Sequence, residues 1–335
     1  MGGSQVKLLS GELEGMLAEI SVTTGCDDWQ VMGDPLIRRE CGIHFLRSPS
    51  FRVPHVVLKA YGDDTVRALA RKLDAKGRFY HGAGTSHCTV PVPILLVRGK
   101  NALVMEFVEA PLAGSLLRKG FHSRETRESI NRTAGRWLQW FHAQSRVTLN
   151  PFDASYFLGK LTSLAGKSSG GGANAAVDAR FFSECMKFAA VVATGLDGVP
   201  MPHAEVHGDF TPFNLFIGGD RMIGFDYQLN RRLPITHDIC RFLLYLEAYR
   251  MWPSRAADLR EYGCCKADFD GFMRANGGDR EWFGNGLWAK LQFLEVARRM
   301  ASLTVRRVSL RNRSFRWIEM RCLCRNARLM MDALR

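Results

Sequence analysis

The sequence contains no run of about 20 consecutive apolar residues, the length that a membrane-spanning helix requires. Its N-terminus also lacks a basic segment followed by an apolar one, so we expect no secretory signal peptide. No repeat of 20–50 residues occurs, and no RNP, KH or zinc-finger pattern points to specific nucleic-acid binding. What remains is ordinary globular composition, with 46% of the 335 residues hydrophobic and 24% charged.

The nine cysteines show no metal-binding pattern. Cys322 and Cys324 are separated by one residue, and Cys264 and Cys265 are adjacent, whereas zinc sites commonly use cysteines with two residues between them. The number of cysteines is odd, their spacing is irregular, and a chain of this length does not need disulfides to fold. We therefore expect reduced thiols and a cytoplasmic protein.

The formal net charge of +13 indicates an anionic partner. Nucleotide, anionic substrate, nucleic acid and membrane surface all satisfy that condition. Much of the excess lies in residues 298–335, which hold eleven arginines and two acids. We favour a solvated helical face for this run over a dedicated binding surface, because basic runs are often only solubilising.

Contact of residues 311–335 with a membrane surface stays open as an alternative. We expect instead that the apolar face of this segment packs onto the rest of the protein. That face would consist of Trp317, Ile318, Leu323, Leu329 and Met330.

Residues 30–108 are rich in strand patterns. Residues 51–60, 92–97 and 102–108 combine β-branched residues with the alternation typical of strands. One helix is expected between these strands, at about 64–79. The first hairpin is expected near residues 38–59.

The pattern becomes helical after residue 110. Ser123 is expected to cap a helix that runs to residue 142, with apolar side chains on one face. Further helices are expected at about 153–164, 178–193, 236–250, 281–304 and 313–334. The outline is that of an α+β protein with a small β-rich part, residues 1–108, and a larger helical part, residues 109–335, and by itself it fits several folds.

Residues 206–228 (VHGDFTPFNLFIGGDRMIGFDYQ) carry the groups best suited to chemistry. Asp209 and Asn214 precede a short hairpin, and Asp226 follows its second strand. Apolar strands beside an Asp raise the cost of burying its charge unless a cation pairs with it. Carboxylate and amide oxygens favour Mg²⁺ as that cation. A capped turn and a strand-end Asp would explain each residue singly, but they explain all three together poorly.

His207-Gly208-Asp209, followed by four residues and then Asn214, resembles the catalytic loop of the protein-kinase superfamily. The glycine after the histidine and the Thr-Pro pair before Asn214 resemble aminoglycoside phosphotransferases and their choline-kinase-like relatives. Asp226 lies twelve residues after Asn214, where that family keeps its metal-binding aspartate. The resemblance covers about residues 40–250. It implies a bilobal protein-kinase-like fold with a nucleotide-binding N-lobe and a catalytic C-lobe.

The resemblance also implies roles for these residues. Asp209 would accept or orient the proton of the acceptor hydroxyl, and Asn214 and Asp226 would hold Mg²⁺ against the phosphates of ATP. His207 would pack behind the loop. Asp238, in the segment PITHDICR, would brace the loop.

Three further positions match the nucleotide-binding part of the family's pattern. Lys59 would pair with α- and β-phosphate oxygens, and Glu106 and Val108 would offer backbone groups to adenine. Asp74 is the candidate acidic partner of Lys59. The predicted turn at residues 46–50 (LRSPS) contains no glycine, so a glycine-rich phosphate loop is not visible there.

The function expected from these observations is transfer of the γ-phosphate of ATP to a hydroxyl of a small molecule or glycan. The basic chain favours a neutral or anionic acceptor. The alternative is a catalytically silent kinase-like protein that binds nucleotide or acts as a scaffold, and the uncertain partner of Lys59 is what supports it.

Overall fold

The computed structural model describes residues 10–37, 41–61, 88–91, 93–97, 102–118, 123–168, 178–227, 232–250, 252–277, 284, 286–305 and 313–335. The chain divides into two compact units. One comprises Met1–Ala110 with Ile223–Phe225, and the other comprises Pro111–Met222 with Asp226–Arg335. The roles predicted for residues 1–108 and 109–335 stay a prediction.

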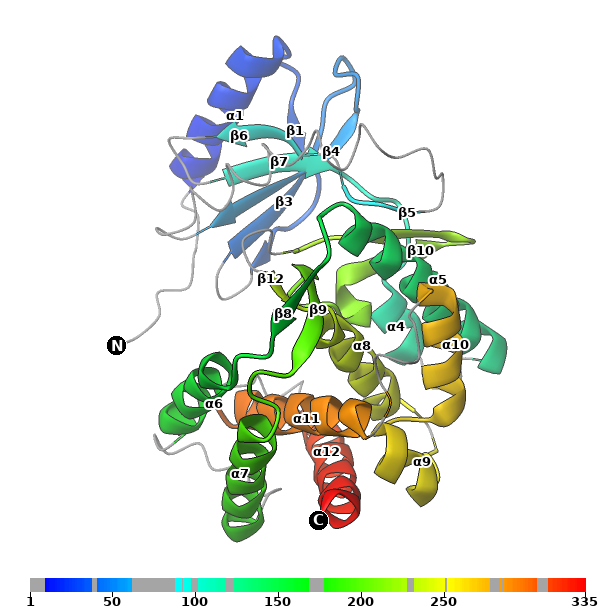
Figure 1. The fold of residues 1–335 in the computed structure, drawn as a ribbon. Helices are drawn as coiled ribbons and strands as arrows, with labels where there is room; N and C mark the ends of the chain where they lie inside the picture. Colours follow the sequence, from blue (N-terminus) through cyan, green and yellow to red (C-terminus); the bar gives the residue numbers. More distant parts are fainter. Residues whose placement is uncertain are drawn as a thin grey trace. The chain divides into compact units, whose positions relative to one another are not determined.

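An antiparallel sheet forms the centre of the first unit, as the strand patterns predicted (Figure 1). Its strand order is β1-β3-β4-β7-β6, and β2 pairs with β3. The strands are β1 (Gln30–Val31), β2 (Leu36–Ile37), β3 (Cys41–Arg47), β4 (His55–Tyr61), β6 (Pro93–Val97) and β7 (Ala102–Glu106). Strand β4 begins four residues later than predicted. Residues 51–54 belong instead to a loop that is closed by the Ser48 amide donating to the Pro54 carbonyl, 3.0 Å away.

The two faces of β4 have different surroundings. Val56, Leu58 and Ala60 are almost fully buried in a cluster with Met16 and Ile20. Those two residues belong to α1 (Ser10–Thr24), a helix that the sequence patterns did not predict. Since side chains alternate along a strand, Lys59 lies on the opposite face of β4 from this apolar cluster.

Helices dominate the second unit, and most of them lie where the periodicity predicted. The predicted helices are α5 (Arg124–Ala143), α6 (Ala154–Ser168), α7 (Ala179–Thr194), α8 (Thr236–Ala248), α11 (Leu287–Val305) and α12 (Arg313–Leu334). Ser123 caps α5 as expected, accepting a hydrogen bond from the Thr126 amide. Within the part of the chain that the structure describes, no helix is long and apolar enough to cross a membrane.

Three shorter helices of this unit were not predicted. They are α4 (Ala113–Arg118), α9 (Ala256–Tyr262) and α10 (Lys266–Asn276). Both α9 and α10 end at a glycine with positive φ, 64° at Gly263 and 65° at Gly277. Such glycines are ordinary helix stop signals, so the two ends were readable from the sequence although the short helices were not.

Short strands frame residues 207–214, which are called the catalytic motif, or catalytic loop, because their sequence resembles that of a kinase catalytic loop. β9 (Pro200–Glu205) precedes it and pairs with β8 (Thr148–Pro151) and β12 (Arg232–Pro234). The predicted hairpin follows as β10 (Leu215–Gly218) and β11 (Arg221–Gly224), joined by Gly219 and Asp220. β5 (Cys88–Thr89) pairs with β11, whose residues 223–224 belong to the first unit.

Aromatic packing supports the catalytic motif from behind. Trp137 stacks on Phe210 with ring centroids 5.5 Å apart, and Phe242 lies 5.2 Å from Phe210 on another side. Trp137 and Phe210 are completely buried. The loop that carries Asp209 is therefore built onto the rigid core of this unit.

Glycines allow two close approaches in the same unit. A Cβ on Gly114 of α4 would lie 2.3 Å from the ring of Phe213, which belongs to the catalytic motif. A Cβ on Gly135 of α5 would lie 2.8 Å from the Phe272 carbonyl oxygen, where α5 and α10 run side by side (Figure 1). Both glycines are therefore required by packing.

The contrast between two helical glycines is testable. We expect Gly135→Ala to lower the free energy of unfolding by about 1–3 kcal/mol, because the new methyl group forces α5 and α10 apart. The matched control is Gly159→Ala in α6, where a Cβ meets nothing within 4 Å. This control should gain about 0.5–1 kcal/mol. Urea denaturation measures both values, and equal effects of the two substitutions would contradict the close packing.

Candidate active site

The catalytic motif forms a tight loop between β9 and β10. Gly208 has a φ of 81°, in the left-handed region that favours glycine, which explains why a glycine follows His207. The loop then enters a single 3-10 turn, Pro212–Asn214, which leads directly into β10. Asp209 and Asn214 thus project from the two ends of one short, constrained segment.

A buried carboxylate on α8 holds the main chain of this loop. Asp238 is completely buried, and its two oxygens accept the amide of His207 at 2.7 Å and the amide of Gly208 at 2.9 Å. A ring nitrogen of His142 lies 3.3 Å from the same carboxylate. The predicted bracing role of Asp238 is confirmed.

The charge on Asp238 is strongly stabilised in the folded protein. Burial acts to raise the pKa of its carboxyl, but the hydrogen bond with His142 and the charges of nearby histidines outweigh burial and lower the pKa to about 2. Asp238 also lies in the first turn of α8, where the helix dipole favours a negative charge.

His207 packs behind the loop, as predicted. It is completely buried, and its ring contacts Trp137, Phe210 and Tyr227. Its Nδ1 accepts the amide of Asp209 at 3.3 Å. The histidine is therefore a structural part of the loop.

Asp209 presents its carboxylate to solvent, with 54% of the side chain exposed. The amide nitrogen of Asn214 donates to the Asp209 carbonyl at 2.8 Å and to Asp209 Oδ2 at 3.1 Å. Because the amide nitrogen of Asn214 faces Asp209, the amide oxygen of Asn214 points away from Asp209 and can bind another partner. An oxygen in that position suits a cation such as Mg²⁺.

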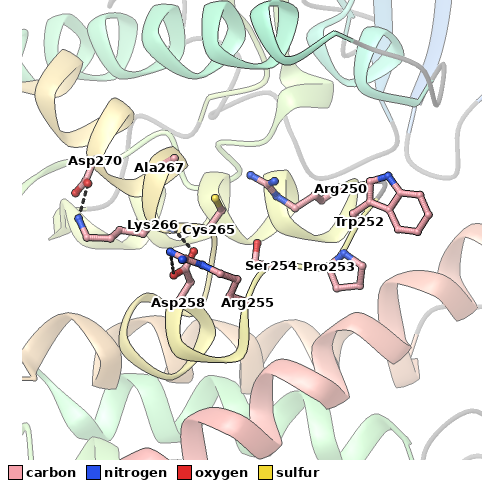
Figure 2. Close-up of a pocket in the computed structure, with 10 residues that line it drawn as sticks. All are labelled: Arg250, Trp252, Pro253, Ser254, Arg255, Asp258, Cys265, Lys266, Ala267 and Asp270. Atoms are coloured by element: carbon pink, nitrogen blue, oxygen red, sulfur yellow. Dashed lines mark hydrogen bonds and ion pairs between the residues drawn. The ribbon is translucent and has the colours of Figure 1, made fainter.

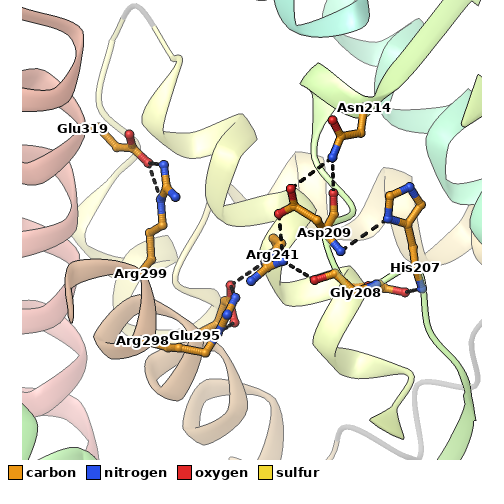
Figure 3. A network of polar contacts seen from close by, with 10 residues as sticks. His207, Gly208, Asp209, Asn214, Arg241, Glu295, Arg298, Arg299 and Glu319 are labelled. Atoms are coloured by element: carbon orange, nitrogen blue, oxygen red, sulfur yellow. Dashed lines mark hydrogen bonds and ion pairs between the residues drawn. The ribbon is translucent and has the colours of Figure 1, made fainter. Parts of the chain in front are cut away.

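Arginine 241 makes the second contact to Asp209 (Figure 3). Its Nη1 donates to Asp209 Oδ1 at 2.8 Å and also to the carbonyl of Gly208. Its Nε donates to Glu295 of α11 at 3.1 Å. Glu295 in turn accepts two hydrogen bonds from Arg298, at 2.7 and 2.5 Å.

Glu295 is a buried carboxyl surrounded by cations. Burial raises its pKa to about 7, and the guanidinium groups of Arg241 and Arg299 oppose that rise. Arg299 pairs with Glu319 of α12 at 2.7 Å and lies over the ring of Tyr245. Each arginine behind Asp209 thus pairs with a carboxylate: Arg241 and Arg298 share Glu295, and Arg299 pairs with Glu319.

These pairs correct one expectation from the sequence. A solvated helical face is the wrong description for Arg298 and Arg299, whose side chains are only 19% and 15% exposed and are paired internally. Part of the expected apolar face of α12 packs inward, since Leu323 and Met330 are completely buried. The expectation is wrong for Trp317 and Ile318, which are about half exposed.

Asp226 follows β11, as predicted, and its backbone is unusual. Among the residues that the structure describes, it is the one non-glycine residue with positive φ, 63°. An aspartate tolerates this conformation better than most residues, at a cost of roughly 1–2 kcal/mol. Strain of this kind clusters at functional sites, which is consistent with a metal-binding role.

The predicted nucleotide-binding residues fall in the first unit. Lys59 lies on the central strand β4, paired with Ile43 and Leu103, and is only 9% exposed. Glu106 ends β7 opposite Val56, and Val108 follows two residues later. Asp74 and the predicted helix at 64–79 lie outside the described residues, so the pairing of Asp74 with Lys59 stays a prediction.

In the first unit, the carboxylate of Asp28 holds the turn at residues 46–50, which contains no glycine. Both Ser48 and Ser50 donate their hydroxyl groups to Asp28, and the amide of Ser50 also donates to it at 3.1 Å. The serine hydrogen bonds lower the pKa of Asp28. This loop therefore presents a carboxylate beside its hydroxyl groups.

A pocket of about 400 Å³ lies elsewhere in the second unit, at the ends of α8, α9 and α10 (Figure 2). Its charged residues pair within the protein: Arg255 with Asp258 at 3.1 Å, and Lys266 with Asp270. None of the predicted site residues lines it. The catalytic motif and this pocket are therefore distinct features.

Arg241, Glu295 and His142 surround the motif and were not predicted from the sequence. Arg241 could have been found, since it follows Asp238 by three residues in a predicted helix and so lies on the same side of that helix. Glu295 is 54 residues further along the chain, and no local pattern connects the two.

No family model matches this chain, and no curated protein matches its sequence. Solved structures do match its fold. A choline/ethanolamine kinase family protein from Mesorhizobium loti matches with a TM-score of 0.57 at 14% identity, covering 96% of this chain and 99% of that chain. A glucosamine kinase in complex with glucosamine, ADP and inorganic phosphate matches with a TM-score of 0.58 at 13% identity, covering 92% and 83%.

The aminoglycoside phosphotransferase APH(4)-Ia matches with a TM-score of 0.59 at 10% identity, covering 95% of this chain and 99% of that chain. These matches extend over nearly the whole chain. The predicted α+β protein-kinase-like fold is therefore confirmed.

The bracing by Asp238 predicts a pH-dependent stability. Its pKa falls from an ordinary 3.8 to about 2 on folding, so its ionised form stabilises the fold by about 2 kcal/mol above pH 4. This contribution is lost as the pH falls from about 4 to about 2. We expect Asp238→Asn to lower the free energy of unfolding at pH 7 by about 1–3 kcal/mol, because one amide loses its acceptor.

Urea denaturation at several pH values measures this effect. The difference between wild type and Asp238→Asn should be constant above about pH 4 and shrink below it. Asp220→Asn, in the exposed turn after β10, is the control and should show little effect at any pH. Equal stability of Asp238→Asn and wild type at pH 7 would refute the bracing role.

Proposed function

We propose that this chain transfers the γ-phosphoryl group of ATP to a hydroxyl group of a small molecule or glycan. The observation that carries the proposal is the geometry of the loop from His207 to Asn214. Its main chain is fixed by Asp238, and the exposed Asp209 carboxylate is held from two sides. The likeness in fold to small-molecule kinases supports the same conclusion.

In the reaction that we propose, the acceptor oxygen forms a bond to the γ-phosphorus. The bond from that phosphorus to the β,γ-bridging oxygen breaks, and ADP leaves with the electron pair. The proton of the acceptor hydroxyl passes to the carboxylate of Asp209. Because such a transfer depends on positioning and charge neutralisation, a rigid loop with a fixed carboxylate suits it.

Asn214 and Asp226 are the residues that would hold Mg²⁺. The amide oxygen of Asn214 is directed away from Asp209, and Asp226 offers an exposed carboxylate at the end of β11. Both are hard oxygen donors of the kind that Mg²⁺ prefers. The ion would neutralise charge on the phosphates.

Lys59 would bind α- and β-phosphate oxygens, and the backbone of Glu106 and Val108 would bind adenine. Lys59 is only 9% exposed on a central strand, a position in which an ammonium group is suited to binding anionic oxygens. Asp74 remains the proposed acidic partner of Lys59.

The acceptor that we propose is neutral or anionic. Glu295 and Glu319, the carboxylates near Asp209 on α11 and α12, already accept hydrogen bonds from arginines. They are therefore poorly placed to attract a cationic acceptor. We do not propose specific nucleic-acid binding, and contact of the basic C-terminal segment with a membrane surface stays an alternative, since Trp317 and Ile318 are about half exposed. All nine cysteines lie in the described residues and form no disulfide with one another, and reduced thiols suit the cytoplasmic location that we propose.

Nucleotide binding is tested by thermal unfolding with ATP and Mg²⁺, against ATP and EDTA. A ligand at a hundredfold its dissociation constant stabilises by about 2.7 kcal/mol, which corresponds to a rise of some degrees. Asp226→Asn should abolish the magnesium-dependent part, and its fold should survive because asparagine also tolerates positive φ. The control Asp220→Asn should respond as wild type does. A protein that no nucleotide stabilises would contradict the proposal.

Catalysis is tested separately by ADP release from Mg·ATP with a panel of acceptors. The panel includes choline, ethanolamine, glucosamine and aminoglycosides, which the fold neighbours suggest, together with neutral sugars and sugar phosphates. We expect Asp209→Asn to lower kcat by about 10²–10⁴-fold while nucleotide binding persists. Nucleotide binding by wild type without turnover of any acceptor would favour the silent, nucleotide-binding alternative.

A further inference from the structure

Helix α8 holds the catalytic loop through two residues on the same side, Asp238 and Arg241. Asp238 accepts the amides of His207 and Gly208. One turn later, Arg241 donates to the carbonyl of Gly208 and to Asp209 Oδ1. The carboxylate thus fixes the main chain of the loop, and the guanidinium reaches the side chain that would do the chemistry.

The position of Arg241 is itself fixed. The residue is only 8% exposed, and its Nε is tied to Glu295, which two hydrogen bonds from Arg298 hold in turn. The planar guanidinium donates in fixed directions, so one group bridges α11, the loop carbonyl and Asp209 at once. A lysine ammonium on a flexible chain cannot reproduce this arrangement.

An exposed carboxylate such as Asp209 would otherwise rotate among several orientations. In this structure Arg241 binds Oδ1 at 2.8 Å and the Asn214 amide binds Oδ2 at 3.1 Å. Each oxygen retains further acceptor capacity, and 54% of the side chain faces solvent. The orientation of the Asp209 carboxylate is therefore fixed, while the group stays accessible to an acceptor hydroxyl.

We propose that Arg241 is a positioning residue, which orients the Asp209 carboxylate for proton transfer from the acceptor hydroxyl. This inference rests on the proposed phosphotransferase function. Arginine stays protonated in proteins, so Arg241 does not take the proton itself. It acts through Asp209, and Glu295 anchors it.

The chain offers a matched control for a merely structural role. Arg127 of α5 is buried to a similar degree, forms a bidentate pair with Asp268 at 2.5–3.1 Å, and donates to the Leu246 carbonyl at 2.8 Å. Like Arg241, it therefore bonds a carboxylate and a main-chain carbonyl, although Arg241 bonds a second carboxylate as well. Unlike Arg241, it makes none of its hydrogen bonds to the catalytic loop.

The experiment compares Arg241→Lys, Arg241→Met and Arg127→Lys with wild type. ADP release from Mg·ATP is measured with water and with the acceptor panel, well below each variant's Tm, and nucleotide binding is measured by thermal shift. We expect the kcat of Arg241→Met to fall about 100-fold, because an Asp209 carboxylate that is not held in the reactive orientation slows the chemical step. Its KM for ATP should stay within about twofold of the wild-type value. Arg241→Lys should regain part of that loss, and Arg127→Lys should lower Tm but not kcat.

If Arg241→Met does not fold, the kcat of Arg241→Lys is compared with that of wild type instead. We expect it to be about tenfold lower. An active wild type with Arg241 variants within about threefold of its kcat would overturn the inference and leave the proposed function standing. A loss of kcat in Arg127→Lys equal to that in Arg241→Lys would also overturn it. If wild type neither binds nucleotide nor releases ADP, the phosphotransferase proposal fails, and the role of Arg241 fails with it.

Discussion

Two main-chain amides of the catalytic loop, those of His207 and Gly208, point at one buried carboxylate, that of Asp238. A buried carboxylate is costly unless it is fully bonded, and unpaired loop amides are costly as well, so each side needs the other. The positive φ of Gly208 lets the chain make the turn that this requires. The placement of Asp209, and with it any chemistry at this loop, depends on that one pairing.

Part of the positive charge of this protein is paired with carboxylates inside the second unit. The chain carries a formal charge of +13, yet arginines 241, 298 and 299 face the carboxylates of Glu295 and Glu319 behind the loop. Pairs that are this buried rarely increase stability over an apolar core, but they do fix geometry. A basic sequence is therefore compatible with nearly balanced charge behind this loop, and net charge alone did not reveal this.

The sequence predicted the fold class, most long helices and the residues of the loop, because these depend on local periodicity and on a motif with fixed spacing. Asp238 was also predicted, because residues 234–241 (PITHDICR) resemble the segment that follows the metal-binding aspartate in the kinase-like pattern. The link from Arg241 to Glu295 could not be predicted, because a tertiary contact between two helices creates it. The short helices α9 and α10 were not predicted for a related reason. Packing, rather than the periodicity of their own sequences, stabilises them.

We propose that this loop and Lys59 of β4 both bind Mg·ATP. The sharpest test is a crystal structure of the protein with Mg²⁺ and a non-hydrolysable ATP analogue. We expect a metal ion bound by the Asn214 amide oxygen and the Asp226 carboxylate, with Lys59 on phosphate oxygens and Asp209 beside the γ-phosphate but not bonded to the metal. A nucleotide bound elsewhere, or a metal ion that avoids both Asn214 and Asp226, would contradict this proposal.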